Sequence, residues 1–86
     1  MYHVVLDRDV TKDLSDIPKR MSQNILRKIE NLANNPRPHQ SQKLSATENA
    51  YRLRVGDYRV IYTIDDSMKV VTVYHIRHRK DVYRFL

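Results

Sequence analysis

The stretch that decides the fold runs from Tyr51 to Tyr62 and reads Tyr-Arg-Leu-Arg-Val-Gly-Asp-Tyr-Arg-Val-Ile-Tyr. Two runs of alternating apolar and polar residues are separated there by Gly56, the only glycine of the chain, and by Asp57. This pattern predicts a β-hairpin with a two-residue loop, because glycine supplies the positive φ angle that so tight a turn needs. The loop sets the register, in which Arg54 is opposite Arg59.

Period-two alternation then divides the hairpin into two faces. The face expected to be buried carries Tyr51, Leu53, Val55, Tyr58, Val60, Tyr62 and Ile64, and the other carries Arg52, Arg54 and Arg59. Like charges directly opposite one another cost about 0.2–1 kcal/mol, so stability does not explain why Arg54 and Arg59 are paired. A polyanion lying across that face would explain it.

Composition narrows the class of protein. The chain has 86 residues, which predicts a single domain over 1–86 with a thin core. It has no cysteine and no apolar run as long as a signal peptide core or a membrane span, so we expect a cytoplasmic protein without disulfides. The net charge of +6 favours a phosphate-bearing or acidic partner. A well-solvated basic surface explains the same charge equally well.

The rest of the chain predicts two helices and two more strands. Residues 2–6 form a short β-branched strand, expected inside the sheet, and Asp7 or Asp9 caps a short helix to about Ser15. A second helix begins near Pro18 and is expected to bury the stripe Ile17, Met21, Ile25, Ile29 and Leu32. A polar connector follows to about residue 50. After the hairpin, residues 65–67 turn, 69–76 form a strand, and the chain ends in a turn or short helix.

The hairpin and the C-terminal stretch Arg77-His-Arg-Lys-Asp-Val-Tyr-Arg84 together resemble the RelE branch of the RelE/ParE toxin superfamily. The resemblance covers about residues 43–84. It implies an α+β fold of order β-α-α-β-β-β, with two helices packed on one face of a small, mostly antiparallel four-stranded sheet. It also implies the toxin of a type II toxin–antitoxin system, a ribosome-dependent endoribonuclease that cuts mRNA in the A site, with the RNA on the sheet face away from the helices.

Cutting RNA without a metal or cofactor requires a ribose 2′-OH to attack the neighbouring phosphate while positive charge stabilises the phosphate oxygens. Arginine suits the second task, because its planar fork matches phosphate oxygens. The resemblance and this chemistry give as catalytic candidates Arg52, Arg54, Arg59, Arg77, His78, Arg79 and Tyr83. The RNA-binding candidates are Lys43, Arg52, Arg54, Lys80 and Arg84.

The residues that would transfer protons are harder to assign than those that would bind phosphate. Some members of the family have lysine where this chain has Arg52 and Arg54, and arginine hardly ever loses its proton. His78 is then the natural base or acid, although a plain surface histidine fits its position equally well, and His75 is expected to pack within its strand. Tyr83 could stack on a base, orient the 2′-OH, or anchor the tail in the core.

The partners implied are a RelB-like antitoxin, mRNA on the 70S ribosome, and operator DNA only through the toxin–antitoxin complex, with no membrane. Three alternatives stay open: a ParE-like gyrase inhibitor without ribonuclease activity, an inactive toxin that acts only as an antitoxin-bound corepressor, and a plain basic nucleic-acid-binding regulator. The three arginines, the His78-Arg79 pair and Tyr83 favour the nuclease, because a gyrase inhibitor needs no phosphate-binding site.

Overall fold

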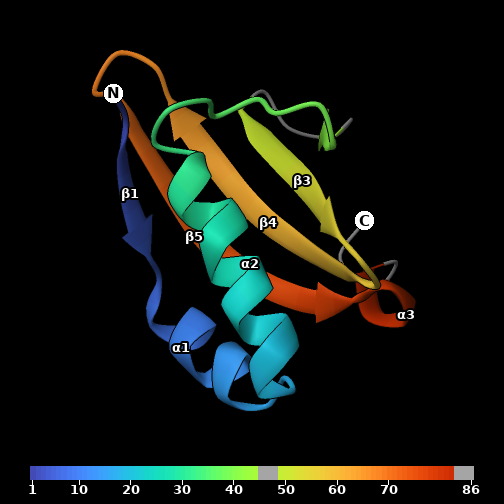
Figure 1. Ribbon diagram of the computed structural model, residues 1–86. Helices are drawn as coiled ribbons and strands as arrows, with labels where there is room; N and C mark the ends of the chain where they lie inside the picture. The colour runs from blue at the N-terminus through green and yellow to red at the C-terminus, as the bar shows by residue number, and fades with distance from the viewer. Residues whose placement is uncertain (45–48, 83–86) are drawn as a thin grey trace.

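The computed structural model describes residues 1–44 and 49–82. Its elements follow the order β1, α1, α2, β2, β3, β4, β5, α3 (Figure 1). Their bounds are β1 His3–Leu6, α1 Arg8–Ser15, α2 Lys19–Asn31, β2 Ser41–Lys43, β3 Ala50–Val55, β4 Tyr58–Asp65, β5 Val70–His78 and α3 Arg79–Val82. The α+β class and the expected element order are confirmed, as is a short helix near the end of the chain.

Within residues 1–44 and 49–82 the sheet has five strands in the order β1-β5-β4-β3-β2, not the four that we expected. The additional strand, β2, lies in the predicted polar connector and pairs antiparallel with β3, where Gln42 is opposite Arg52. Its sequence, Ser-Gln-Lys, has no apolar alternation to reveal it. The expectation that residues 2–6 lie inside the sheet is wrong, because β1 lies at the edge of the sheet and, of the strands described, pairs only with β5, to which it is parallel.

The central hairpin has the predicted register. Arg54 is opposite Arg59, and Leu53 is opposite Val60. Gly56 has φ 60°, the positive angle at the first loop position that a type II′ turn needs. A side chain on Gly56 would come within 3.3 Å of Met21 Cε, so α2 packs closely against the turn.

Both longer helices pack on one face of the sheet, which we call the core face, and α2 crosses in front of β4 and β5 in Figure 1. The core contains Val10 from α1 and Ile25 and Ile29 from α2. Most of the stripe predicted for the second helix is therefore buried, while Met21 is only half-buried. The strands contribute Leu53, Val55, Val60, Tyr62, Ile64, Val71, Val73 and Ile76.

Strand β5 contains a β-bulge, which decides which side chains leave the core face. Ile61 is opposite His75 and Tyr62 is opposite Val73, so Tyr74 is an extra residue without a partner on β4. An extra residue reverses the alternation of the strand beyond it. The core positions of β5 are therefore Val71, Val73 and then Ile76, rather than every second residue.

Candidate functional site

The sheet face opposite the core face carries a row of three arginines, and we call it the arginine face. Arg54 of β3 is opposite Arg59 of β4, and Arg59 is in turn opposite Arg77 of β5. A second row lies beside the first, because Arg52 is opposite Ile61 and Ile61 is opposite His75. Neighbouring strands are about 4.8 Å apart, so the register places four arginines at nearby positions of one face.

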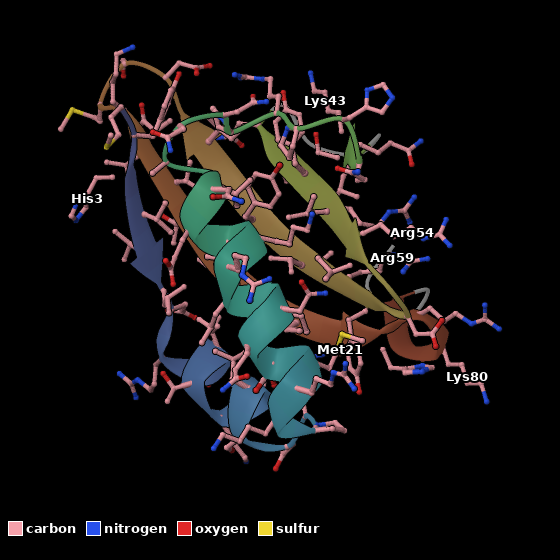
Figure 2. The ribbon with its side chains drawn as sticks, viewed as in Figure 1. His3, Met21, Lys43, Arg54, Arg59 and Lys80 are labelled. Carbon is pink, nitrogen blue, oxygen red and sulfur yellow. The ribbon has the colours of Figure 1, made fainter. Side chains whose placement is uncertain are left out.

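The hairpin arginines differ in their surroundings. Arg54 is exposed, whereas Arg59 is half-buried and its Nη1 donates hydrogen bonds to the carbonyl oxygens of Gly56 (3.2 Å) and Tyr58 (3.1 Å). These hydrogen bonds hold the Arg59 side chain against the turn at Gly56. The same turn sets the register that places Arg59 opposite Arg54. Figure 2 shows Arg54 and Arg59 side by side near the turn. The predicted pairing of like charges is present in the structure.

Arg52 is oriented by the additional strand. Its Nη2 donates a 2.7 Å hydrogen bond to Oε1 of Gln42, its partner across β2 and β3. Gln42 was not among the predicted site residues, because only the pairing of β2 with β3 brings it beside the hairpin. A neutral acceptor orients the guanidinium without cancelling its charge.

Arg77 belongs to the arginine row by register but is paired with an acidic residue of α1. Its Nη1 lies 2.7 Å from Oδ2 of Asp13, and the side chains are only 24% and 18% exposed. The same carboxylate oxygen accepts a 3.2 Å hydrogen bond from the backbone N–H of Ile76. Strand β1 pairs with β5 only as far as Val73, so the edge of β5 after that residue is not covered by β1. There Asp13 accepts the hydrogen bond of Ile76 N–H and holds the Arg77 side chain.

The bulge places the two histidines of β5 on opposite faces. His75 shares the arginine face with Arg77, whose Nη2 lies 3.3 Å from His75 Nδ1. His78 is opposite Tyr58 and forms an edge-to-face contact with its ring, with centroids 5.4 Å apart. His78 is thus not brought together with the hairpin arginines. His75, which we expected to pack within its strand, is half-buried beside Arg77. The break in spacing from Val71 and Val73 to Ile76 is the one signal in the sequence that could have shown this.

The remaining candidates are spread around the sheet. Lys43 is opposite Tyr51 in register and so alternates away from the arginine face. Arg79 begins α3 and is exposed, and its N–H donates to the carbonyl oxygen of Asp57 at 2.6 Å. Lys80 is exposed, and Figure 2 shows it well separated from Lys43.

Tyr83 and Arg84 lie outside the described residues, so their roles stay predictions.

A second charged cluster fastens the loop after α2 to the turn between β4 and β5. Arg37 forms a bidentate ion pair with Asp66, with bonds of 3.3 and 2.8 Å, and its Nε donates to the Tyr51 hydroxyl at 3.0 Å. Tyr2 donates a 2.6 Å hydrogen bond to the same carboxylate. The hydrogen bonds from Arg37 and Tyr2 lower the pKa of Asp66 to about 2. Because these residues bond to one another, we assign this cluster to the scaffold.

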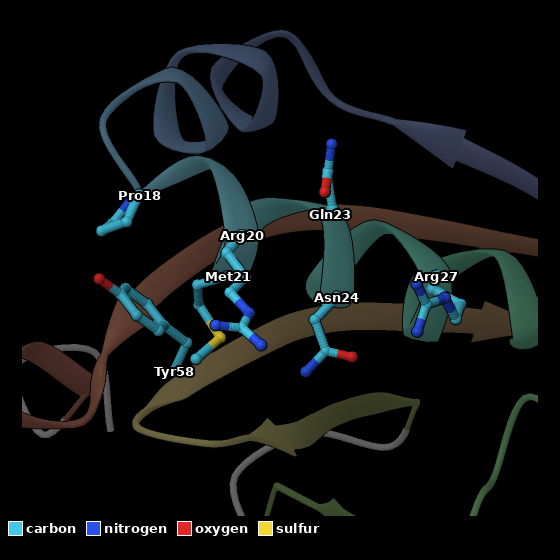
Figure 3. Close-up of a pocket in the computed structure, with 7 residues that line it drawn as sticks. All are labelled: Pro18, Arg20, Met21, Gln23, Asn24, Arg27 and Tyr58. Atoms are coloured by element: carbon cyan, nitrogen blue, oxygen red, sulfur yellow. The ribbon is translucent and has the colours of Figure 1, made fainter.

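A groove of about 660 Å³ lies on the other side of the molecule, between α2 and the hairpin turn. Figure 3 shows Tyr58 and Met21 near one another at this groove, with Arg20 and Arg27 along α2. Of the predicted site residues that the structure describes, none lines it.

Two classes of site are not found in the described part of the chain. Residues 1–44 and 49–82 contain no cluster of three or more histidine, cysteine or acidic side chains that could hold a metal ion. Among the same residues, no helix is long and apolar enough to cross a membrane.

Comparison with known proteins assigns the family. A model described as the ParE toxin of type II toxin–antitoxin systems, parDE, matches residues 4–83. The toxin RelE of Mycobacterium tuberculosis is 32% identical over 84 residues, which cover 96% of this chain and 87% of that protein.

The comparison with solved structures gives the same family. A chain of the archaeal RelE–RelB complex from Pyrococcus horikoshii has a TM-score of 0.82 and 32% identity, covering 91% of this chain and 94% of that one. A chain of the M. tuberculosis RelBE2 toxin–antitoxin complex has a TM-score of 0.78 and 26% identity, covering 91% and 98%. The chain therefore belongs to the RelE/ParE superfamily. Within that superfamily it is a toxin of a type II toxin–antitoxin system, of the RelE family.

Proposed function

We propose that this toxin is a ribosome-dependent endoribonuclease that cleaves mRNA in the A site, and so inhibits translation and arrests growth. The observation that carries the proposal is the register of Arg54, Arg59 and Arg77 across three adjacent strands of the arginine face. Opposed cations on a protein surface are unfavourable by themselves, and they become favourable when a phosphate backbone lies over them.

The proposed reaction needs no metal. The 2′-OH of one nucleotide loses its proton and attacks the adjacent phosphorus, the bond to the 5′ oxygen breaks, and that oxygen takes up a proton. Negative charge grows on the phosphate oxygens during attack, where Arg54 and Arg59 would stabilise it. Arg52, oriented by Gln42, would bind the same backbone. Arg79, Lys80, Tyr83 and Arg84 complete the proposed RNA contacts from the end of the chain. Lys43, whose register turns it away from the arginine face, would contact only RNA that passes round the β2 edge of the sheet.

Primer extension on mRNA in translating ribosomes tests the proposal. We expect the wild type to produce cuts within A-site codons and Arg59→Ala to reduce the cleavage rate on the order of a hundredfold or more, as loss of one preorganised donor does. Arg8→Ala is the matched control, because Arg8 is an exposed arginine of α1 rather than of the arginine face, and it should cleave normally. Wild-type protein that leaves the mRNA intact would overturn the proposal.

We further propose that a RelB-like antitoxin binds and neutralises this toxin, and that the toxin reaches operator DNA only within that complex. The support is that the chains it resembles were solved as RelE–RelB and RelBE2 complexes. Co-expression with the antitoxin should restore growth, and the two proteins should copurify. Growth arrest that the cognate antitoxin does not relieve would contradict this.

A gyrase inhibitor is the second candidate, because the matching family model is described as a ParE toxin. A supercoiling assay distinguishes the two. Inhibition of gyrase without mRNA cleavage would favour this candidate, and cleavage without inhibition would favour the nuclease.

A further inference from the structure

Tyr74 is the extra residue of the bulge in β5, and it faces outward. The register between β4 and β5 passes from Val73 to His75, so Tyr74 has no partner on β4. Val73 is fully buried on the core face, and alternation from it turns Tyr74 to the arginine face. Tyr74 is 39% exposed and is not among the partly buried residues packed against the core.

The Tyr74 ring is not held by its neighbours. Within residues 1–44 and 49–82 its hydroxyl forms no hydrogen bond, and its ring contacts no other aromatic ring or cation. Of the strands described, β1 ends its pairing at Val73, so no strand lies beside Tyr74 on that side. Bulges often re-aim a side chain next to an active site, and this one places an aromatic ring in solvent.

Val5 forms an apolar patch with Tyr74 beside the arginines. Val5 is opposite Thr72 in the parallel register, so it lies on the arginine face, about 8 Å from Tyr74 between backbones. It is also 39% exposed. Leu6 is similarly exposed, but it is opposite Val73 and so lies on the other face. The other exposed large hydrophobic residues of the described chain are methionines outside the strands.

This division of the face matches the two parts of a single RNA strand. The phosphates require positive charge, whereas the bases present apolar faces that stack on aromatic side chains. Tyr74 is three residues along β5 from Arg77, which is opposite Arg59, so about 10 Å of strand separates the ring from the arginine row. An RNA backbone over Arg59 would reach Tyr74 within a few nucleotides.

We propose that Tyr74 is a further RNA-binding residue, whose ring stacks on a base of the mRNA strand bound over the arginine face, with Val5 at the border of the same platform. The inference rests on the proposed ribonuclease function and adds a base-binding part to its site. Every base has a π face, so this contact raises the affinity for RNA without selecting a codon. Tyr74 transfers no proton.

The test measures single-turnover cleavage of mRNA on stalled ribosomes over a range of toxin concentrations. Tyr74→Leu and Tyr74→Thr remove the ring, and Tyr74→Phe keeps it. We expect both ring-less variants to need on the order of tenfold more toxin for half-maximal cleavage, with the maximal rate little changed. Tyr74→Phe should behave as the wild type does.

Met68→Ala is the control. It removes an apolar side chain that is 71% exposed in the turn between β4 and β5, away from the arginine face, and it should cleave normally. Urea unfolding of each variant separates loss of the ring from loss of the fold.

Messenger RNAs with a single abasic nucleotide test the stacking itself. At one position in or beside the A-site codon, removing the base should cost the wild type as much as removing the ring does. The same abasic mRNA should cost Tyr74→Leu nothing more, because one contact can be lost only once.

Three results would overturn the inference while the proposed function stands. In the first, the folded ring-less variants have the concentration dependence of the wild type. In the second, Tyr74→Phe is as weak as Tyr74→Leu, which would assign the effect to the hydroxyl. In the third, the abasic and Tyr74→Leu effects multiply at every position tested. A wild-type protein that leaves the mRNA intact would instead overturn the proposed function, and this inference with it.

Discussion

Asp13 and Arg77 are 64 residues apart in sequence, and their 2.7 Å ion pair joins α1 to the edge of β5 beyond the end of β1. Both side chains are largely shielded from water, and a hydrogen bond between charged groups in such a place contributes about 2 kcal/mol. We therefore expect Asp13→Asn to lower the free energy of unfolding by about 2 kcal/mol. Urea denaturation followed by circular dichroism would measure it.

Asp16→Asn is the control for that prediction. Asp16 is the exposed C-cap residue of the same helix, and its side chain has no hydrogen bond or ion pair within residues 1–44 and 49–82. Its replacement should change stability by no more than about 0.5 kcal/mol. If the two variants unfold at the same urea concentration, the ion pair contributes nothing to the fold.

The hairpin could be predicted from sequence because its determinants are local. Gly56 and the alternation on either side of it specify the turn, the register and the face of every side chain in β3 and β4. The stripe on α2 is equally local, since residues three or four apart meet on one helix face. The pairing of Arg54 with Arg59 follows from these short-range rules alone.

The place of β1 and the face of His75 depend on contacts that no local pattern contains. Strand β1 lies at the edge because residues 3–6 pair with residues 70–73, near the other end of the chain. The bulge at Tyr74 reverses the alternation of β5, so a strict period of two assigns His75 and His78 to the wrong faces. The roles of Asp13 and Gln42 follow only from the assembled sheet.

The turn at Gly56 provides a second prediction. A residue with a Cβ atom at φ 60° is strained by about 1–2 kcal/mol, and the new Cβ would also lie 3.3 Å from Met21 Cε. We expect Gly56→Ala to lower the free energy of unfolding by about 1 kcal/mol or more. Gly56→Asn should lose less, because asparagine tolerates positive φ better than alanine. Equal unfolding midpoints for Gly56→Ala and the wild type would show that the turn is not strained.

The ion pair between Arg37 and Asp66 predicts a dependence of stability on pH. The pKa of Asp66 is about 2 in the folded protein, and the ordinary value for aspartate is about 3.9. The folded state thus binds the proton less tightly than the unfolded state. The stability from this pair is complete above the unfolded pKa, and it is lost as the pH falls from about 4 towards 2.

Urea midpoints of the wild type and Asp66→Asn between pH 5 and pH 2 would test this. The wild type should be the more stable at pH 5, by a modest amount because both side chains are about half exposed, and the difference should shrink towards pH 2. A carboxyl signal of Asp66 that titrates near 3.9 in an NMR experiment would contradict the prediction.

Because Arg54 is opposite Arg59, we expect replacing Arg54 to change stability and cleavage activity in opposite directions. Relieving the repulsion between two like charges on adjacent strands should stabilise the sheet, so we expect Arg54→Gln to raise the free energy of unfolding by about 0.2–1 kcal/mol. Because Arg54 is exposed, added salt should reduce this gain. Under the proposed function the same variant loses a phosphate contact, and its mRNA cleavage should slow on the order of a hundredfold.

Arg52→Gln separates the two effects. Arg52 is opposite Ile61 rather than another arginine, and it donates to Gln42, so its replacement should slow cleavage without raising stability. If Arg54→Gln is more stable than the wild type and Arg52→Gln is not, then the destabilisation comes from the opposed pair of Arg54 and Arg59. An Arg54→Gln variant that unfolds more easily than the wild type would mean that the two guanidinium groups do not repel one another, and the main physical reason to place RNA on this face would be lost.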